Sequence, residues 1–228
     1  MKCARCGSRS QPFPFEHAAL LLCEGASDAA FFRQFLPARN LPESHIKASS
    51  DLGNGAGIDG FAAAIKGAKV ASGFKKIKHL VIIADNDHDQ TANFKRVKRQ
   101  VESAGDIPIP EAPNIVQKES DKPDVTILMM PPGENTGSLE SLIYSVARSA
   151  NDANGRAVED LKSASGVGAW SRQKQAKMLL RCFIACTYEK KPDIGLGQFF
   201  SQHDGGNLVS LDNSAFDPLS DLLSPILT

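Results

Sequence analysis

The stretch "HLVIIADNDHD", His79 to Asp89, joins a short apolar run to acidic residues at alternate positions, Asp85, Asp87 and Asp89. A short aliphatic run that ends in polar and turn-forming residues is typical of a buried β-strand, here Leu80 to Ala84. Two other runs and a weaker third share this pattern: Ala18 to Cys23, Val125 to Met130, and Ile46 to Ser50.

Helical patterns separate these strands. "SDAAFFRQFL" places its phenylalanines on one face, and we expect this helix to end before Pro37, because a residue that precedes proline disfavours the helical conformation. "FAAAIKGAKVA" and "NFKRVKRQVESAG" predict two more helices, the second closed by Gly105. This alternation predicts an α/β fold with a mostly parallel, Rossmann-like sheet of about four strands and helices on both faces.

The character of the chain changes after Ala147. "SRQKQAKMLLRCFIACTYEK" predicts an amphipathic helix, and "IGLGQFFSQ" and "DPLSDLLSPIL" predict shorter helices. We expect an N-terminal extension over residues 1–16, an α/β domain over 17–150, and a helical C-terminal extension over 151–228 that packs on the same domain. The proline-rich segment "DIPIPEAPN" is either an insertion or part of a crossover.

Composition limits the location and the partners of the protein. Lys+Arg 26 balance Asp+Glu 26, so a polyanion such as nucleic acid must be bound by local rather than overall charge. The apolar runs are far shorter than the roughly 20 residues that span a bilayer, and the N-terminus lacks the apolar segment of a secretory signal. We expect a cytoplasmic protein without a membrane partner, and the sequence leaves an oligomer open.

The cysteines form an odd and unevenly spaced set, which favours reduced thiols over a disulfide framework. Cys3 and Cys6 have the spacing of half a zinc site, and Cys182 and Cys186 lie one helical turn apart. Because these pairs lie at opposite ends of the chain, we favour an N-terminus outside the core and two core cysteines on a helix, and zinc binding stays open.

Acidic residues follow the predicted strands. The carboxyl ends of parallel strands line one edge of a sheet, where ligands bind, so Glu24, Asp85, Asp87 and Glu140 are expected at that edge. Alternate residues of an extended chain point to the same side, which would let Asp85 and Asp87 face one ion. Close carboxylates repel one another unless a cation lies between them, and oxygen ligands favour Mg²⁺ or Mn²⁺ over Zn²⁺.

Each acidic residue also has a purely structural explanation. Asp and Asn after a strand are common turn formers, and Glu24 followed by Gly25 fits a strand-to-helix turn. Glu140 in the first turn of a helix is favoured by the helix dipole by roughly 0.3 to 1 kcal/mol without any ligand. The occurrence of several acidic residues together at the ends of the predicted strands is what favours a metal site.

As a set, "LLLCEGASDAAFF", "HLVIIADNDHD" and "GSLESLI" resemble the three signatures of the Toprim domain, in the expected order over about Ala18 to Ala147. The third is similar to the Gly-x-Leu-Glu form found near OLD-family nucleases and small uncharacterised Toprim-like proteins. The resemblance implies a Toprim-like fold and a carboxylate site that binds a divalent metal.

The resemblance also implies roles for individual residues. The acidic candidate metal ligands are Glu24, Asp28, Asp85, Asp87, Asp89 and Glu140. Of these, Glu24, Asp85 and Asp87 are also candidate acid/base groups. Lys174 or Lys177 resembles a downstream catalytic lysine of OLD-type sites, although lysines on an amphipathic helix are usually its solvated face.

The chain departs from the larger Toprim enzymes. Toprim topoisomerases need a tyrosine in a separate strand-passage domain, and Toprim primases need a complete zinc module and a larger body. These 228 residues are too few for the strand-passage domain of the topoisomerases or for the larger body of the primases. The phosphate-binding pattern G-x-x-x-x-G-K-[ST] is also missing from them, so a nucleotide-driven step would require a separate ATPase partner.

The leading hypothesis for function is a Mg²⁺- or Mn²⁺-dependent nuclease, or a related phosphoryl-transfer enzyme, acting on DNA or RNA. The basic stretches "KGAKVASGFKKIKH" and "FKRVKRQ" could grip the nucleic acid, but they are equally typical of solvated helix faces. The alternative is a non-catalytic Toprim-like subunit that binds metal or nucleotide within a defence or repair complex. A haloacid-dehalogenase-like phosphatase fits poorly, because those enzymes carry Asp-x-Asp after their first strand.

Overall fold

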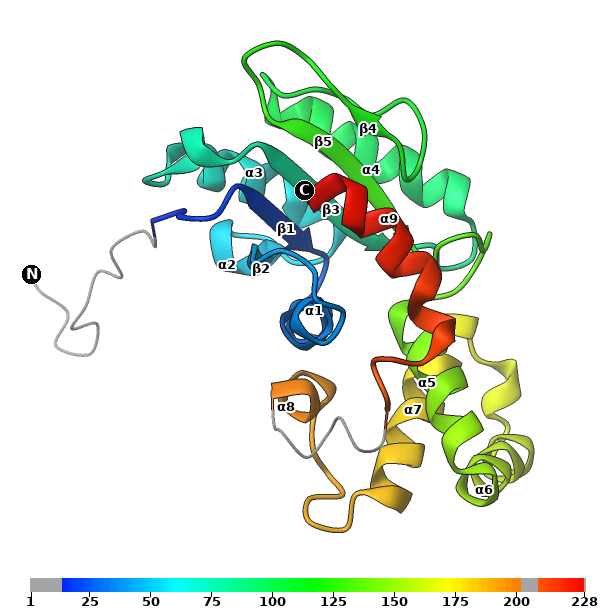
Figure 1. The fold of residues 1–228 in the computed structure, drawn as a ribbon. Helices are drawn as coiled ribbons and strands as arrows, with labels where there is room; N and C mark the ends of the chain where they lie inside the picture. Colours follow the sequence, from blue (N-terminus) through cyan, green and yellow to red (C-terminus); the bar gives the residue numbers. More distant parts are fainter. Residues whose placement is uncertain (1–13, 202–208, 228) are drawn as a thin grey trace, which may run out of the picture.

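The computed structural model describes residues 14–201 and 209–227, and a five-stranded sheet forms its centre (Figure 1). The strands are β1 Ala19–Cys23, β2 His45–Ala48, β3 His79–Asp85, β4 Val116–Gln117 and β5 Asp124–Met130. They lie in the order β2-β1-β3-β5-β4, and every pairing is parallel except that of β4 with β5. The predicted α/β class and its mostly parallel, Rossmann-like sheet are confirmed.

The register of the sheet brings the ends of its central strands together. Cys23 of β1 pairs with Ile83 of β3, and Ile83 pairs with Leu128 of β5. From β1 the chain first pairs to one side, with β2, and then returns to the other side as β3. The carboxyl ends of β1 and β3 therefore flank the switch point at which open α/β sheets bind ligands.

Helices cover both faces of the sheet, as predicted. They are α1 Ala26–Ala38, α2 Ser49–Leu52, α3 Phe61–Val70, α4 Gln90–Ala104, α5 Leu139–Ala150, α6 Asp152–Ala164, α7 Arg172–Thr187, α8 Leu196–Ser201 and α9 Asp217–Leu227. Leu20 and Leu22 of β1 pack with α3 and α4, whereas Leu21 and Cys23 pack into a core with α1, α5, α7, α8 and α9. This alternation is that of a strand buried on both faces.

The end of α1 differs from the prediction. The helix continues through Pro37 to Ala38, so the expected stop before Pro37 was wrong. Pro37 lies in the last turn, where its fixed φ suits a helix, and the Arg39 N–H donates to the Phe35 carbonyl at 3.0 Å to close that turn. Burial of the Leu36 side chain offsets the restriction that proline places on the preceding residue.

The connection from β3 to β5 contains an element that the pattern did not predict. Gly105, with φ 65°, closes α4 as expected, and α4 itself makes the crossover between the parallel strands. The segment "DIPIPEAPN" that follows is therefore an insertion, and it leads into β4, where Val116 pairs with Thr126 at the edge of the sheet. A two-residue strand is too short to show the alternation on which strand prediction depends.

The helical C-terminal region shares its core with the sheet. Phe216, which is fully buried just before α9, meets the rings of Phe31 and Phe35 in α1 at centroid distances of 5.6 Å and 5.9 Å. In Figure 1, α9 runs across the sheet while α5, α6 and α7 lie together beside it. Helix α6 was not predicted, because its polar sequence carries Gly155 and only a narrow apolar side.

The chain joins the core by Phe15, and the two cysteines of α7 differ in exposure. Cys3 and Cys6 lie outside the described residues, whereas Phe15 is 1% exposed and its N–H donates to the Ser72 carbonyl at 2.8 Å. On α7, Cys182 is partly buried and Cys186 is exposed, so the prediction that both are core residues was wrong for Cys186. Within residues 14–201 and 209–227, none of the helices is both long and apolar enough to cross a membrane.

Candidate metal centre at the carboxyl edge of the sheet

Glu24 lies directly after β1 and faces the end of β3. Its N–H donates to the Ile83 carbonyl at 3.0 Å, which extends the β1–β3 pairing by one residue. Its carboxylate accepts a long hydrogen bond of 3.4 Å from the Asp85 N–H. Ser49 Oγ, at the start of α2, donates to the Glu24 carbonyl at 2.9 Å, so β3 and the helix that follows β2 both hold this residue in place.

Asp85 is the last residue of β3 and is only 9% exposed. Its Oδ1 accepts a hydrogen bond of 3.0 Å from the N–H of Leu139, the first residue of α5. A carboxylate at this position also lies in the positive field of the helix N-terminus. The third signature segment is thus joined directly to the strand end that carries the Asp-x-Asp pair.

Two further carboxyl groups come from helices. Asp28, in the first turn of α1, accepts a hydrogen bond of 2.8 Å from the Gly25 N–H. Glu140, in the first turn of α5, is 7% exposed, and its Oε1 lies 3.7 Å from Nζ of Lys177. Its Oε2 is buried and has no hydrogen-bond partner among the described residues, which is unusual for a carboxylate oxygen.

These carboxyl groups act on one another electrostatically. Burial raises the pKa of Asp85 well above its ordinary value, and the charges of Asp28, Glu140 and Glu24 raise it further. Burial likewise raises the pKa of Asp28 to about 7, again with contributions from Glu140 and Glu24. The pKa of Glu24 is raised by burial and by the charge of Asp87. Mutual repulsion of this kind in a buried setting is the property that a divalent cation relieves.

Asp87 lies at the rim of this group rather than inside it. It has φ 51°, and its N–H and carbonyl pair with Gly137, so the chain bends after β3 and does not continue as an extended strand. Asp87 Oδ2 accepts a hydrogen bond of 2.8 Å from Asn93, whereas Oδ1 is buried and has no partner in the part of the chain described. The expectation that Asp85 and Asp87 face the same side of an extended strand was therefore wrong.

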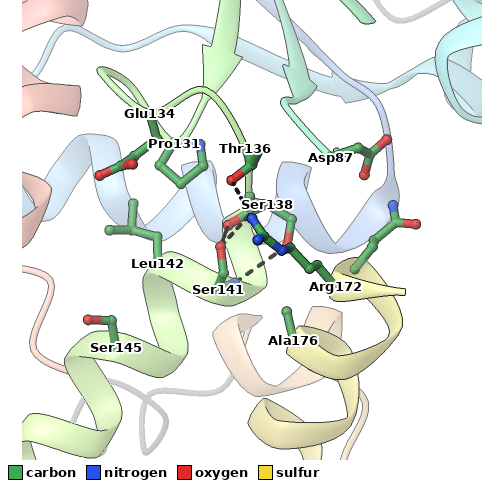
Figure 2. A pocket seen from close by; sticks show the side chains of 12 residues that line it. Asp87, Pro131, Glu134, Thr136, Ser138, Ser141, Leu142, Ser145, Arg172 and Ala176 are labelled. Carbon is green, nitrogen blue, oxygen red and sulfur yellow. Dashed lines mark hydrogen bonds between the residues drawn. The ribbon is translucent and has the colours of Figure 1, made fainter. Parts of the chain in front are cut away.

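A cavity of about 360 Å³ opens beside Asp87 (Figure 2). Its walls include Pro131 and Leu142, the hydroxyl groups of Ser141 and Ser145, and Arg172 at the start of α7. The Arg172 guanidinium donates to Thr136 Oγ1 at 3.3 Å, which ties α7 to the loop before α5. This space is large enough for a small polar ligand next to the Asp87 carboxylate.

The structure separates the remaining sequence candidates. Asp89 is exposed and caps α4, since its Oδ1 accepts a hydrogen bond of 3.0 Å from the Ala92 N–H. Lys177 is paired with Glu140, whereas Lys174 is exposed on α7 beside Trp170. Of the two candidate lysines, Lys177 is thus the one that the structure brings to the acidic group.

The basic stretches fall at different ends of the sheet. Lys69, Lys75 and Lys78 line a cavity that also contains His79, the first residue of β3, so this cluster lies at the amino edge, opposite the acidic group. The positive charge of Arg96 in α4 acts on the carboxylate of Glu24 and offsets a small part of the rise in its pKa that burial causes. The first basic stretch therefore lies away from the candidate site, and the second reaches it through Arg96.

Two asparagines that were not among the predicted site residues hold the site together. Asn86, fully buried, donates through Nδ2 to the carbonyls of Pro131 and Glu134, both at 2.8 Å, and so fixes the loop before α5. Asn93 of α4 holds Asp87. Asn86 lies between the two aspartates of the Asp-x-Asp motif. An amide side chain at the end of a buried strand needs hydrogen-bond partners, and this was the signal in the sequence that could have indicated its role.

The helix-capping role of Asp89 can be tested by substitution. We expect Asp89→Ala to lower the free energy of unfolding by about 1 kcal/mol, because one N–H of the first turn of α4 loses its partner. Asp89→Asn should change it by only a few tenths of a kcal/mol, since asparagine caps equally well. Urea unfolding measures both. Loss of Mn²⁺ binding in Asp89→Asn would instead assign Asp89 to the metal site.

The acidic group fits a hard divalent cation by its chemistry. All of its donors are oxygens, and the buried, unpartnered oxygens of Glu140 and Asp87 are free to accept a ligand bond. In the arrangement shown by residues 14–201 and 209–227, no three His, Cys, Asp or Glu side chains are already positioned around one ion. Binding would therefore require the carboxylates to rotate toward a common point.

The fold and its acidic edge define an α/β protein with a Rossmann-like sheet and a helical C-terminal region. The chain belongs to the family described as "Protein of unknown function (DUF3226)", whose model matches residues 18–227. The matched segment contains the sheet and the C-terminal helices, so both are part of the family unit. Searches of curated proteins and of solved structures found no match.

Proposed function

We propose that this protein is a divalent-metal-dependent nuclease, or a related phosphoryl-transfer enzyme, with a Toprim-like carboxylate site. The observation that carries the proposal is the grouping of Glu24, Asp28, Asp85 and Glu140 at the switch point of a parallel sheet, where burial and the charges of Glu24 and Glu140 raise the pKa of Asp28 and Asp85. Buried carboxyl groups with perturbed pKa values in such a position are typical of functional sites.

In this proposal Glu24, Asp85, Asp87 and Glu140 hold Mg²⁺ or Mn²⁺. The bound ion supplies neutralisation of phosphodiester charge and activation of water. Lys177, next to Glu140, adds a positive charge where the phosphate would enter. Arg172 extends into the cavity beside Asp87 and is placed to hold a second phosphate or a nearby polar group of the substrate.

A second candidate is a non-catalytic Toprim-like subunit that binds metal or nucleotide for a protein partner. One observation favours it: the Asp85 oxygen is already bonded to the Leu139 N–H, and Glu140 is already paired with Lys177. Carboxyl groups occupied in this way could serve a structural or switching role without catalysis. Such a subunit would bind metal and yet cleave nothing.

Cleavage assays with metal control separate the two candidates. Single- and double-stranded DNA and RNA are incubated with the protein in Mg²⁺, in Mn²⁺, or in excess chelator. The enzyme proposal expects cleavage that chelator abolishes, together with a Mn²⁺-dependent rise in thermal stability, because a ligand bound only by the folded state stabilises it. Stabilisation by Mn²⁺ without cleavage of any substrate would favour the subunit. If Mn²⁺ causes neither stabilisation nor cleavage, that result contradicts the metal site.

The affinity for Mn²⁺ should rise with pH. Asp28 has a pKa of about 7 and that of Asp85 is raised well above its ordinary value, so the metal-free protein holds protons here that the metal must displace. Between about pH 6 and pH 7 the affinity should increase about tenfold per pH unit for each proton displaced. Titration calorimetry at several pH values measures the affinity for Mn²⁺. An affinity that does not change with pH would contradict the displacement of protons by the metal.

The same shifts fix how the stability of the metal-free protein depends on pH. Asp28 keeps its proton in the folded state up to about pH 7 but loses it near pH 4 when unfolded, so folding takes up a proton between these values. The free energy of unfolding should therefore fall as pH rises through this window. Asp28→Asn should weaken the fall, as urea unfolding at several pH values would show.

A further inference from the structure

Trp170, the only tryptophan in the chain, is 50% exposed at the turn before α7. The turn is firmly hydrogen-bonded, since the Trp170 N–H donates to the Val167 carbonyl at 2.9 Å and Gln175 Nε2 donates to the Trp170 carbonyl at 2.7 Å. A large aromatic ring is thus held at the surface by its backbone. Exposed aromatic rings on fixed backbone are common where a ligand stacks.

The helix that follows this turn is locally basic in a chain without net charge. Between Asp160 and Glu189 the sequence contains no acidic residue. The exposed basic side chains of α7 are Arg172, Lys174, Lys177 and Arg181. An acid-free basic segment attracts an anion locally even though the whole protein is neutral.

Three of these side chains form one line along the helix. Lys174, Lys177 and Arg181 are three and four residues apart, which places them on one side of α7. At 1.5 Å per residue the line is roughly 10 Å long, enough to meet neighbouring phosphates of one strand. The other side of α7 packs Leu179 and Phe183 into the core, so the basic side remains at the surface.

This line passes directly by the acidic group. Lys177, its middle member, is the residue paired with Glu140 at 3.7 Å, and Trp170 lines a surface hollow together with Lys174 at one end. At the start of the same helix, Arg172 lies in the cavity beside Asp87 (Figure 2). A polymer bound along α7 would therefore be brought to the candidate metal centre.

We propose that Trp170, Lys174, Lys177 and Arg181, the α7 surface, bind single-stranded nucleic acid. The Trp170 ring stacks on an unpaired base, Lys174 and Arg181 bind phosphates, and Lys177 receives the phosphate nearest the carboxyl groups. The inference rests on the proposed function in that it names the substrate class of that site.

An exposed indole ring selects for a single strand for a geometric reason. In a duplex, each base face is covered by its neighbours in the stack, so a side chain can stack only on a base that is unpaired or at an end. Stacking on aromatic side chains tolerates any base, and binding through phosphates is likewise independent of sequence. We therefore expect little sequence preference.

The fluorescence of Trp170 provides a direct test. With chelator present, so that no cleavage occurs, a short oligothymidylate should cause a saturable loss of tryptophan emission, and a blunt duplex of equal length should cause much less. Because the chain has one tryptophan, the signal reports on this position alone. Emission that stays unchanged while a labelled strand is shown to be bound by anisotropy would overturn the proposal, and so would equal affinity for the duplex.

Substitution of the ring should weaken binding by a defined amount. In anisotropy assays, Trp170→Ala should lower the affinity for the single strand about 10- to 100-fold, the value of stacking one base, and Trp170→Phe should recover much of it. The matched control is Leu161→Ala on α6, an apolar side chain of similar exposure (48%), which should have no effect. An equal loss in Leu161→Ala, or none in Trp170→Ala, would contradict the stacking role.

The phosphate contacts can be tested by their salt dependence. The double variant Lys174→Gln with Arg181→Gln should reduce the slope of log affinity against log salt by about 1.4, the value for two phosphate contacts on a single strand. The control Lys66→Gln lies on α3, on the other face of the sheet, and should leave the slope unchanged. The reverse pattern would move the binding surface to the first basic stretch.

These results can be told apart from failure of the proposed function. Quenching by the oligonucleotide in chelator, with no cleavage of any substrate in Mn²⁺, would remove the nuclease proposal and leave the α7 surface standing. Metal-dependent cleavage without quenching would keep the nuclease and overturn the surface. If the oligonucleotide causes no quenching and no strand is bound, the proposed role of the α7 surface is overturned as well.

Discussion

Asp85→Asn should lose nucleic-acid cleavage by about 10²- to 10³-fold while the protein stays fully folded. The loss follows because one anionic ligand and its stabilisation of the transition state disappear together. The fold should tolerate the change, since burial raises the pKa of Asp85 and so favours its neutral form in the metal-free protein, and an asparagine oxygen can still accept the hydrogen bond from the Leu139 N–H. Single-turnover cleavage in Mn²⁺ and urea unfolding in chelator measure the two effects.

Asp89→Asn is the matched control for this experiment. It makes the same chemical change four residues away, at a residue that caps α4, and it should retain cleavage within a few-fold of wild type. Glu24→Gln should behave like Asp85→Asn, because Glu24 faces the same strand end. Full activity in both Glu24→Gln and Asp85→Asn would show that these carboxyl groups do not take part in catalysis.

The largest effect on stability is expected from Phe216→Ala, at about 3 to 5 kcal/mol. Phe216 is fully buried and its ring packs against those of Phe31 and Phe35, so its removal leaves a cavity where the C-terminal region meets α1. Denaturant unfolding should show a single transition shifted to lower urea. Leu161→Ala, at an exposed position, should change the free energy of unfolding by less than about 0.5 kcal/mol.

The shape of the unfolding curve tests whether the C-terminal helices unfold together with the sheet. If the C-terminal helices formed an independent unit, Phe216→Ala would release them in an early transition and leave the sheet as stable as in wild type. The shared core of β1, α1 and the C-terminal helices argues for one cooperative unit instead. Two separated transitions would contradict that interpretation.

The central strands could be predicted because they are buried on both faces. β1, β3 and β5 read as continuous apolar runs, and their ends match the predictions to within about one residue. β4 has two residues and belongs to no recognisable pattern, and α6 carries few apolar residues, although its Asn151 cap was a usable start signal. Pro37 shows the opposite case, in which burial of a neighbouring side chain outweighed a local preference.

The site was predictable to the extent that strand ends determine it. Glu24 and Asp85 meet because parallel strands end at one edge, and Glu140 joins them because the first turn of α5 packs against Asp85. The choice between Lys174 and Lys177 depends on how α7 is rotated against α5, which no pattern in one sequence specifies. The bend at Asp87 depends on its pairing with Gly137, a contact between segments that are distant in the chain.

The most direct test of a metal centre at this edge is an anomalous difference map from a crystal grown or soaked in Mn²⁺. We expect a peak between the ends of β1 and β3, with carboxylate oxygens of Glu24 and Asp85 at roughly 2.0 to 2.5 Å and with Asp87 or Glu140 completing the set of ligands. The side chains should have rotated from the arrangement described above. A saturating Mn²⁺ soak that leaves this edge without a peak, with Asp85 still bonded to Leu139 and Glu140 still paired with Lys177, would contradict it.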